Sequence, residues 1–159
     1  MHDTRGSATA QSIVGFSDIK SVPEAIDDWD VFLHDGDAFL RTGIAAHIKG
    51  KKAFTPEILY NIVAMAIEKF VMAALMQRGA LPHNHTMRDL VESMEEVFPG
   101  AMGQLKEGLL DLDHYQEICD SDSYNIIAPA MEEIPKMLAL AEGVQTLVYE
   151  TTGGKKGCH

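Results

Sequence analysis

The sequence predicts an all-α protein, an up-and-down antiparallel bundle of four to five helices. Apolar residues recur at intervals of three and four along most of the chain, which is the spacing of one face of a helix. No segment shows the alternation of apolar and polar residues that is typical of a half-buried strand. The content of 46% hydrophobic and 23% charged residues in a chain of 159 indicates one globular domain with a substantial core.

The clearest helix is predicted over residues 56–78, in the centre of the bundle. Thr55 can cap its first amide groups, Pro56 suits the first helical position, and Gly79 can take the left-handed conformation that closes a helix. Apolar side chains surround nearly the whole circumference, which is typical of a core helix. Glu68 and Lys69 interrupt this run, and each charge would cost about 2.5–3.5 kcal/mol at the centre of a bilayer. We therefore expect a soluble core helix in which these two residues make polar contacts with neighbouring helices or with a dimer mate.

Two further helices are predicted on either side of this one. The first follows the capping-box spacing of Ser21-Val-Pro-Glu24, carries an apolar stripe over residues 26–40 and ends near Gly43. A connection over residues 44–54 should follow it. On the other side, Asn84 or Thr86 can cap a helix whose apolar residues recur from 87 to 98.

The remaining helices and the domain limits follow from Pro and Gly residues and from apolar spacing. A fourth helix is predicted from Met102 to Tyr115 and is ended by Asp120-Ser-Asp-Ser123, and a fifth begins with Pro135 in its first turn. Residues 1–20 should form a flexible N-terminal arm, residues 21–150 the helical bundle, and residues 151–159 a disordered tail.

Charge and cysteine content limit the classes of function. The net charge of −11 opposes non-specific binding to phosphate backbones, so bulk nucleic-acid binding is not expected. Only Cys119 and Cys158 occur, which implies no disulfide framework and favours a reducing cytoplasm. The polar first 12 residues contain no signal peptide, and we expect no membrane insertion.

Residues of the central helix and of the helix after it resemble the signature of the HEPN domain family. The resemblance rests on Ala66-Ile-Glu-Lys-Phe-Val-Met-Ala-Ala-Leu75, on Gly79 and Pro82, and on His85-Thr-Met-Arg-Asp-Leu90, with Met72 in place of the family's usual second Lys. It implies a helical bundle, commonly dimeric. Members of this family include RNA-cutting toxins, partners of nucleotidyltransferases, and nucleotide-binding or purely structural modules.

The resemblance also raises the question of catalysis. Catalytic members of the family cut RNA with an Arg and a His that have four to six residues between them, and here Arg78 has this spacing to both His83 and His85. In those enzymes the pair lies by the start of a late helix, whereas residues 111–130 of this chain contain His114 but no Arg. We therefore expect a non-catalytic member. The alternative is a metal-independent ribonuclease that uses Arg78 with His83 or His85.

Candidate ligand-binding residues and partners complete the expectations. A nucleotide-like ligand would be contacted by cationic or imidazole side chains, and the candidates are Lys49, Lys51, Lys52, Arg78, His83, His85 and Arg88. We expect neither a metal nor a cofactor, because His83 with His85, and Asp111 with His114, each supply too few ligands for a site. The apolar surface predicted on the first, second and fifth helices favours a homodimer, with a nucleotidyltransferase-type protein or a nucleotide as the further partner.

Overall fold

The computed structural model describes residues 23–115 and 128–154, and this part of the chain consists of helices and loops without a strand. This confirms the predicted all-α bundle. The predicted N-terminal arm, the predicted end of the fourth helix at residues 120–123, and both cysteines lie outside the described residues. The elements are α1 (Trp29–Lys49), α2 (Pro56–Gln77), α3 (Met87–Val97), α4 (Leu105–Leu112), η1 (Asp113–Tyr115), η2 (Met131–Glu133) and α5 (Ile134–Thr152).

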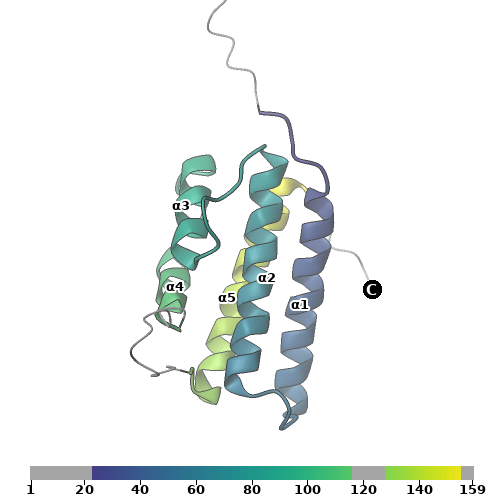
Figure 1. Ribbon diagram of the computed structural model, residues 1–159, viewed down its shortest axis with the longest axis vertical. Coiled ribbons are helices and arrows are strands. Elements are labelled where there is room, and N and C mark those ends of the chain that lie inside the picture. Colours follow the sequence, from purple (N-terminus) through teal and green to yellow (C-terminus); the bar gives the residue numbers. More distant parts are fainter. Residues whose placement is uncertain (1–22, 116–127, 155–159) are drawn as a thin grey trace, which may run out of the picture.

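Helix α2 is the central element, as predicted. Figure 1 shows α1 on one side of it, the shorter α3 and α4 on the other side, and α5 behind it, where α5 packs against α1, α2 and α4. The Thr55 hydroxyl accepts a hydrogen bond from the Ile58 amide at 3.3 Å, and Pro56 occupies the first turn. Gly79 follows the helix end with a φ of 71°, so the predicted start and stop signals are both confirmed.

The composition of α2 reflects its burial. It is the one described helix that is long and apolar enough to cross a membrane, and 61% of its most apolar window is buried inside the bundle. Phe70, Ile67 and Ala66 are fully enclosed. The core helix of a bundle meets the same criteria of length and hydropathy as a membrane span, because both are surrounded by apolar groups.

Helix α1 differs from the prediction at both ends. It begins at Trp29, and residues 23–26 instead lie over the end of α2, where the Ile26 amide donates to the Met76 carbonyl at 2.7 Å. It continues to Lys49, so the predicted end near Gly43 is wrong. Gly43 is buried inside the helix, where a Cβ atom would lie 3.3 Å from both Ile62 and Leu138. The glycine therefore allows close packing and does not end the helix, and residues 44–49 are helical.

Helices α3 and α4 form an antiparallel pair. Thr86 caps α3 by accepting a hydrogen bond from the Asp89 amide at 3.1 Å, as predicted. The Asp113 carboxylate, just past the end of α4, accepts hydrogen bonds from the Met87 and Arg88 amides at 2.9 Å each, so the end of one helix meets the start of the other. The α-helical part of α4 ends at Leu112, and Tyr115 belongs to the 3-10 turn η1.

The connection between α2 and α3 does not turn the chain directly back. His85, just before α3, contacts Glu68 in the middle of α2, whereas Phe98, just after α3, lies against Arg78 at the end of α2. Residues 79–86 therefore run back along α2, and α3 then points in the same direction as α2 (Figure 1). Helices α2 and α5 also run in the same direction, since Gln77 and Thr152 at their ends are joined, whereas α1 runs antiparallel to both (Figure 1).

Helix α5 completes the bundle. Pro135 lies in its first turn as predicted, and the helix continues to Thr152, with Gly153 closing it at a φ of 66°. Thr151 and Thr152, which the prediction assigned to the tail, are thus helical. The Gln77 side chain of α2 donates to the Thr152 carbonyl at 2.8 Å, which fastens the ends of α2 and α5 together.

Candidate functional site

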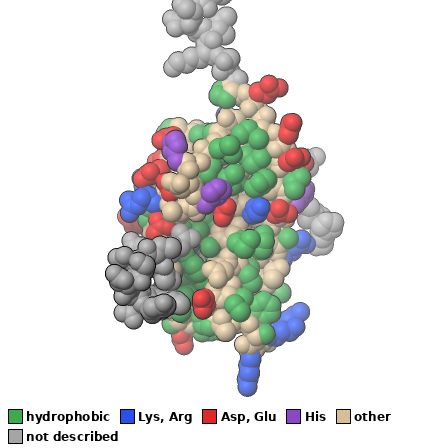
Figure 2. All heavy atoms as spheres, in the orientation of Figure 1, with side chains coloured by type: hydrophobic (Ala, Val, Ile, Leu, Met, Phe, Trp, Pro, Cys, Tyr) green, Lys and Arg blue, Asp and Glu red, His purple; other side chains and the backbone are tan. Residues whose placement is uncertain are grey.

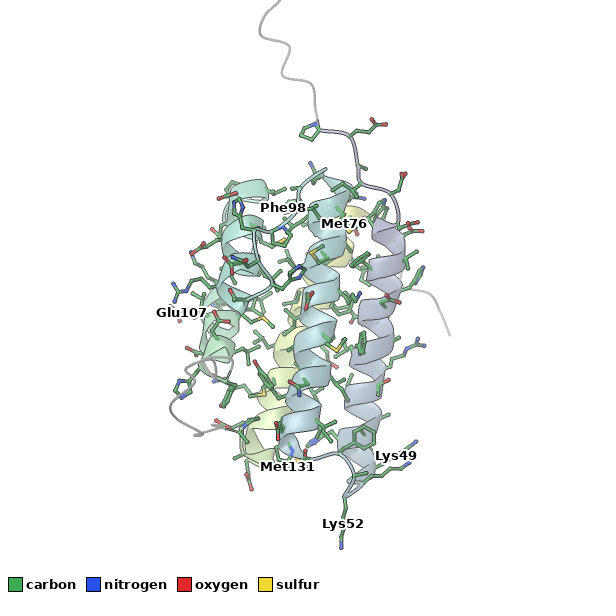
Figure 3. The ribbon with its side chains drawn as sticks, viewed as in Figure 1. Lys49, Lys52, Met76, Phe98, Glu107 and Met131 are labelled. Atoms are coloured by element: carbon green, nitrogen blue, oxygen red, sulfur yellow. The ribbon has the colours of Figure 1, made fainter. Side chains whose placement is uncertain are left out.

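The seven predicted ligand-binding residues lie in separate parts of the structure. Lys49 ends α1, and Lys51 and Lys52 follow it in an exposed loop. Figure 3 shows Lys49 and Lys52 pointing away from the bundle at the end opposite to Met76. Arg78 follows the last residue of α2, and a 22-residue helix is about 33 Å long. One small ligand therefore cannot contact the lysines together with the residues that follow α2.

Arg78 and the two loop histidines engage different surroundings. The Arg78 guanidinium carbon lies 5.2 Å from the centre of the Phe98 ring, and His85 Nδ1 lies 2.7 Å from Glu68 Oε1. His83 is exposed. Glu68 and Arg78 are ten residues apart on one helix, a rise of about 15 Å. Arg78 and His85 are thus held at different levels of the bundle and do not converge as the ribonuclease alternative with His85 needs.

The described residues contain no group of three His, Cys, Asp or Glu side chains placed to hold a metal ion. The side chains around the His83 to His85 loop have other contacts. Asp89 shares a short hydrogen bond with the Thr86 hydroxyl, and His85 contacts Glu68. These contacts order the start of α3.

A cavity of about 810 Å³ lies between α4 with η1 on one side and η2 with α5 on the other. On its rim the Tyr115 hydroxyl donates to Glu133 at 3.0 Å, and the second oxygen of Glu133 accepts from the Ala130 amide at 2.8 Å. Burial, and then the hydrogen bond to Glu133, raise the pKa of Tyr115. The lining is Arg88, Gln104, Glu107, Gly108, Leu110, Asp111, Leu112, Asp113, His114, Tyr115, Glu133, Lys136, Met137 and Leu140.

The chemistry of this cavity favours no single class of ligand. Its lining contains both carboxylates and the cations Arg88 and Lys136, and the acids Asp113 and Glu133 already accept hydrogen bonds from protein groups. Sequence reasoning missed the cavity because its walls come from α3, α4 and α5, which meet only in the folded chain. The one sequence signal is the spacing of Asp111 and His114, which by itself is typical of a partial metal motif.

The outward sides of α1 and α2 form an apolar surface, here called the α1–α2 face. Lys69 Nζ of α2 lies 3.8 Å from Asp35 Oδ2 and 4.3 Å from the centre of the Phe32 ring, both of α1. The outward residues of the two helices therefore lie side by side. Figure 2 shows apolar side chains spread over this side of the molecule. Helical spacing assigns to the face Phe32, Asp35 and Phe39 of α1, and Ile58, Ile62, Met65 and Lys69 of α2.

A narrow band of charged side chains crosses this face. Asp35 pairs with Lys69, the adjacent residue Glu68 pairs with His85, and the four side chains are 49%, 26%, 33% and 61% exposed in that order. Figure 2 shows this band as a row of acidic, basic and His side chains with apolar surface on both sides. Lys69 thus contacts α1, and Glu68 contacts the α2–α3 connection, as expected for polar residues of a core helix.

Comparison of the chain with models of protein families, with curated proteins and with solved structures gives no match. The resemblance to the HEPN family rests on the residues of α2 and α3 quoted above. The most informative features for function are therefore the surfaces that the bundle presents.

Proposed function

We propose that this chain is a non-catalytic helical association module, resembling the HEPN modules, which forms a homodimer through its α1–α2 face. The observation that carries this proposal is the exposure of large aliphatic side chains on the central helix. Ile58 and Met65 are 42% and 43% exposed, although α2 is otherwise the most enclosed helix of the bundle. A contiguous exposed apolar surface of this kind is typical of an interaction site.

The chemistry of the face supports a protein partner. Phe32 and Phe39 are only partly buried against the core and lie beside the aliphatic row of α2. Aromatic residues and Met are enriched at protein interfaces, whereas Lys and Glu are depleted there. Covering such surface stabilises a complex by about 25 cal/mol per Å² of apolar area removed from water.

The shape of the face supports a second copy of the chain. Helices α1 and α2 contain 21 and 22 residues and lie side by side, which gives a surface about 30 Å long and 20 Å wide. Its area of about 600 Å² is at the lower end of the roughly 600–1,000 Å² per partner that specific, stable interfaces bury. Most oligomers of identical chains are two-fold symmetric dimers in which the same patch of each copy is covered.

Light scattering on purified protein at micromolar concentration tests the proposal. The wild-type chain should have the mass of two chains, and Met65→Glu should have the mass of one, because a carboxylate would be buried without a partner at the centre of the interface. Circular dichroism should show the same helix content for both proteins.

Ile48→Glu is the matched control. Ile48 is 75% exposed and lies on a different side of α1. Asp37 contacts Gln145 of α5, and Ile48, eleven residues after Asp37, lies on the same side of the helix. This variant should stay dimeric. A wild-type chain of monomer mass would overturn the proposed function, and a monomeric Ile48→Glu variant would overturn the assignment to the α1–α2 face.

A further inference from the structure

The charged band on the α1–α2 face has an alternating order of signs. Across the face, Asp35 is negative, Lys69 positive and Glu68 negative, and the imidazole of His85 lies beyond Glu68. We infer that this band determines the alignment of the homodimer, with the two-fold axis parallel to the helices and passing between Lys69 and Glu68. The inference rests on the proposed function, because it specifies how two α1–α2 faces meet.

The argument follows from the symmetry of two identical faces in contact. A two-fold axis that lies in the interface and parallel to the helices reverses the left-to-right order of one face. When the row is read backwards, its two central positions have the opposite sign. Lys69 would then face the partner's Glu68, and Asp35 would face the partner's His85.

The other simple alignment has the opposite electrostatic consequence. If the two-fold axis ran along the band, the helices of the two copies would be antiparallel and each charged residue would face its own counterpart. Lys69 would meet the partner's Lys69, and Glu68 the partner's Glu68. Like charges placed against each other in an interface are strongly unfavourable, so the band selects the parallel alignment.

The surroundings of the band increase its effect. Lys69 and Glu68 are about a quarter and a third exposed, with apolar surface on both sides, so a second copy would remove them from most of the remaining water. Charges interact more strongly when solvent and salt screen them less. The band would therefore contribute mainly to the choice of alignment, while the apolar side chains supply most of the binding free energy.

Charge reversal followed by mixing tests this alignment. Glu68→Lys alone places Lys69 against the partner's new lysine, and Lys69→Glu alone places Glu68 against the partner's new glutamate. Each single variant should show a rise in the dimer Kd of roughly tenfold or more by sedimentation equilibrium. An equimolar mixture of the two variants should restore a dimer of near wild-type affinity, because both central contacts then join opposite charges.

The change in net charge provides an internal control. Glu68→Lys changes the net charge from −11 to −9, since −11 + 2 = −9, and lower net repulsion alone would strengthen association. A weaker dimer in this variant must therefore come from the local contact. The double variant that carries both reversals in one chain keeps opposite charges across the axis and should dimerise.

The outcomes separate the alignment from the proposed function. If both single variants dimerise as tightly as the wild-type chain while Met65→Glu is monomeric, the α1–α2 face is the interface but the inferred alignment is wrong. Weak single variants whose mixture stays monomeric would also overturn the alignment. A monomeric wild-type chain would overturn the proposed function itself.

Discussion

The Tyr149 hydroxyl of α5 donates a hydrogen bond to the Asp37 carboxylate of α1. The second oxygen of Asp37 accepts a hydrogen bond from the Gln145 side chain at 2.6 Å, so two residues of α5 bind one carboxylate of α1. Burial, and then the hydrogen bond to Asp37, raise the pKa of Tyr149. These contacts join α1 and α5 on the flank of the bundle away from the α1–α2 face.

Tyr149→Phe should lower the free energy of unfolding by about 2 kcal/mol at pH 7, because a hydrogen bond to a charged group is lost. The effect should depend on pH. The pKa of Tyr149 is higher in the folded chain than in the unfolded chain, where it is about 10, so its contribution is complete below pH 10 and is lost as the pH rises further. Urea denaturation from about pH 8 to pH 12 measures this. A constant difference between the two proteins over that range would contradict the assignment.

Gly36→Ala should destabilise the bundle, because a Cβ atom there would lie 2.7 Å from two ring carbons of the fully buried Phe70. Overpacking of this kind costs about 1–3 kcal/mol, and the better helix propensity of Ala, worth about 1 kcal/mol, offsets only part of it. Gly43→Ala in the same helix is the control. Its Cβ atom would meet only side-chain ends at 3.3 Å, so stability should stay the same or rise. Urea unfolding of the two variants measures the difference. Equal midpoints would show that the Phe70 ring does not prevent a larger side chain at position 36.

Asp113→Ala should cost about 2–3 kcal/mol of stability, because the amides of Met87 and Arg88 at the start of α3 lose a charged acceptor. Asp111→Ala removes an exposed carboxylate two residues earlier and should change stability little. Thermal unfolding of both variants provides the comparison. If Asp111→Ala were the more damaging substitution, the capping role of Asp113 would be wrong.

Local signals explain what could be predicted. Thr55 with Pro56, Gly79, Thr86 and Pro135 mark helix ends through their own backbone preferences and through hydrogen bonds to residues close in the chain. Gly43 misled the prediction because a glycine that ends a helix and one that lets two helices approach look alike in sequence. Its neighbours Ile62 and Leu138 are distant in the chain.

The functional surfaces depended on long-range contacts. Asp35 and Glu68 are far apart in sequence, and only the packing of α1 and of the α2–α3 connection against α2 brings them into one band with Lys69 and His85. The same holds for the cavity between α4 and α5. The candidate ligand residues share charge or spacing in the sequence. In the structure, the length of α2 separates the lysines from the residues that follow α2.

By itself, the sequence determined that this chain is an all-helical bundle around residues 56–77, since apolar spacing and capping residues act over one or two turns. Only the tertiary structure decided that α3 runs parallel to α2 and that an alternating row of charges crosses an apolar face. The physical reason is that the direction of a helix in the bundle and the pattern of charges on its surface come from contacts between residues distant in the chain. The periodicity of a single helix does not contain this information.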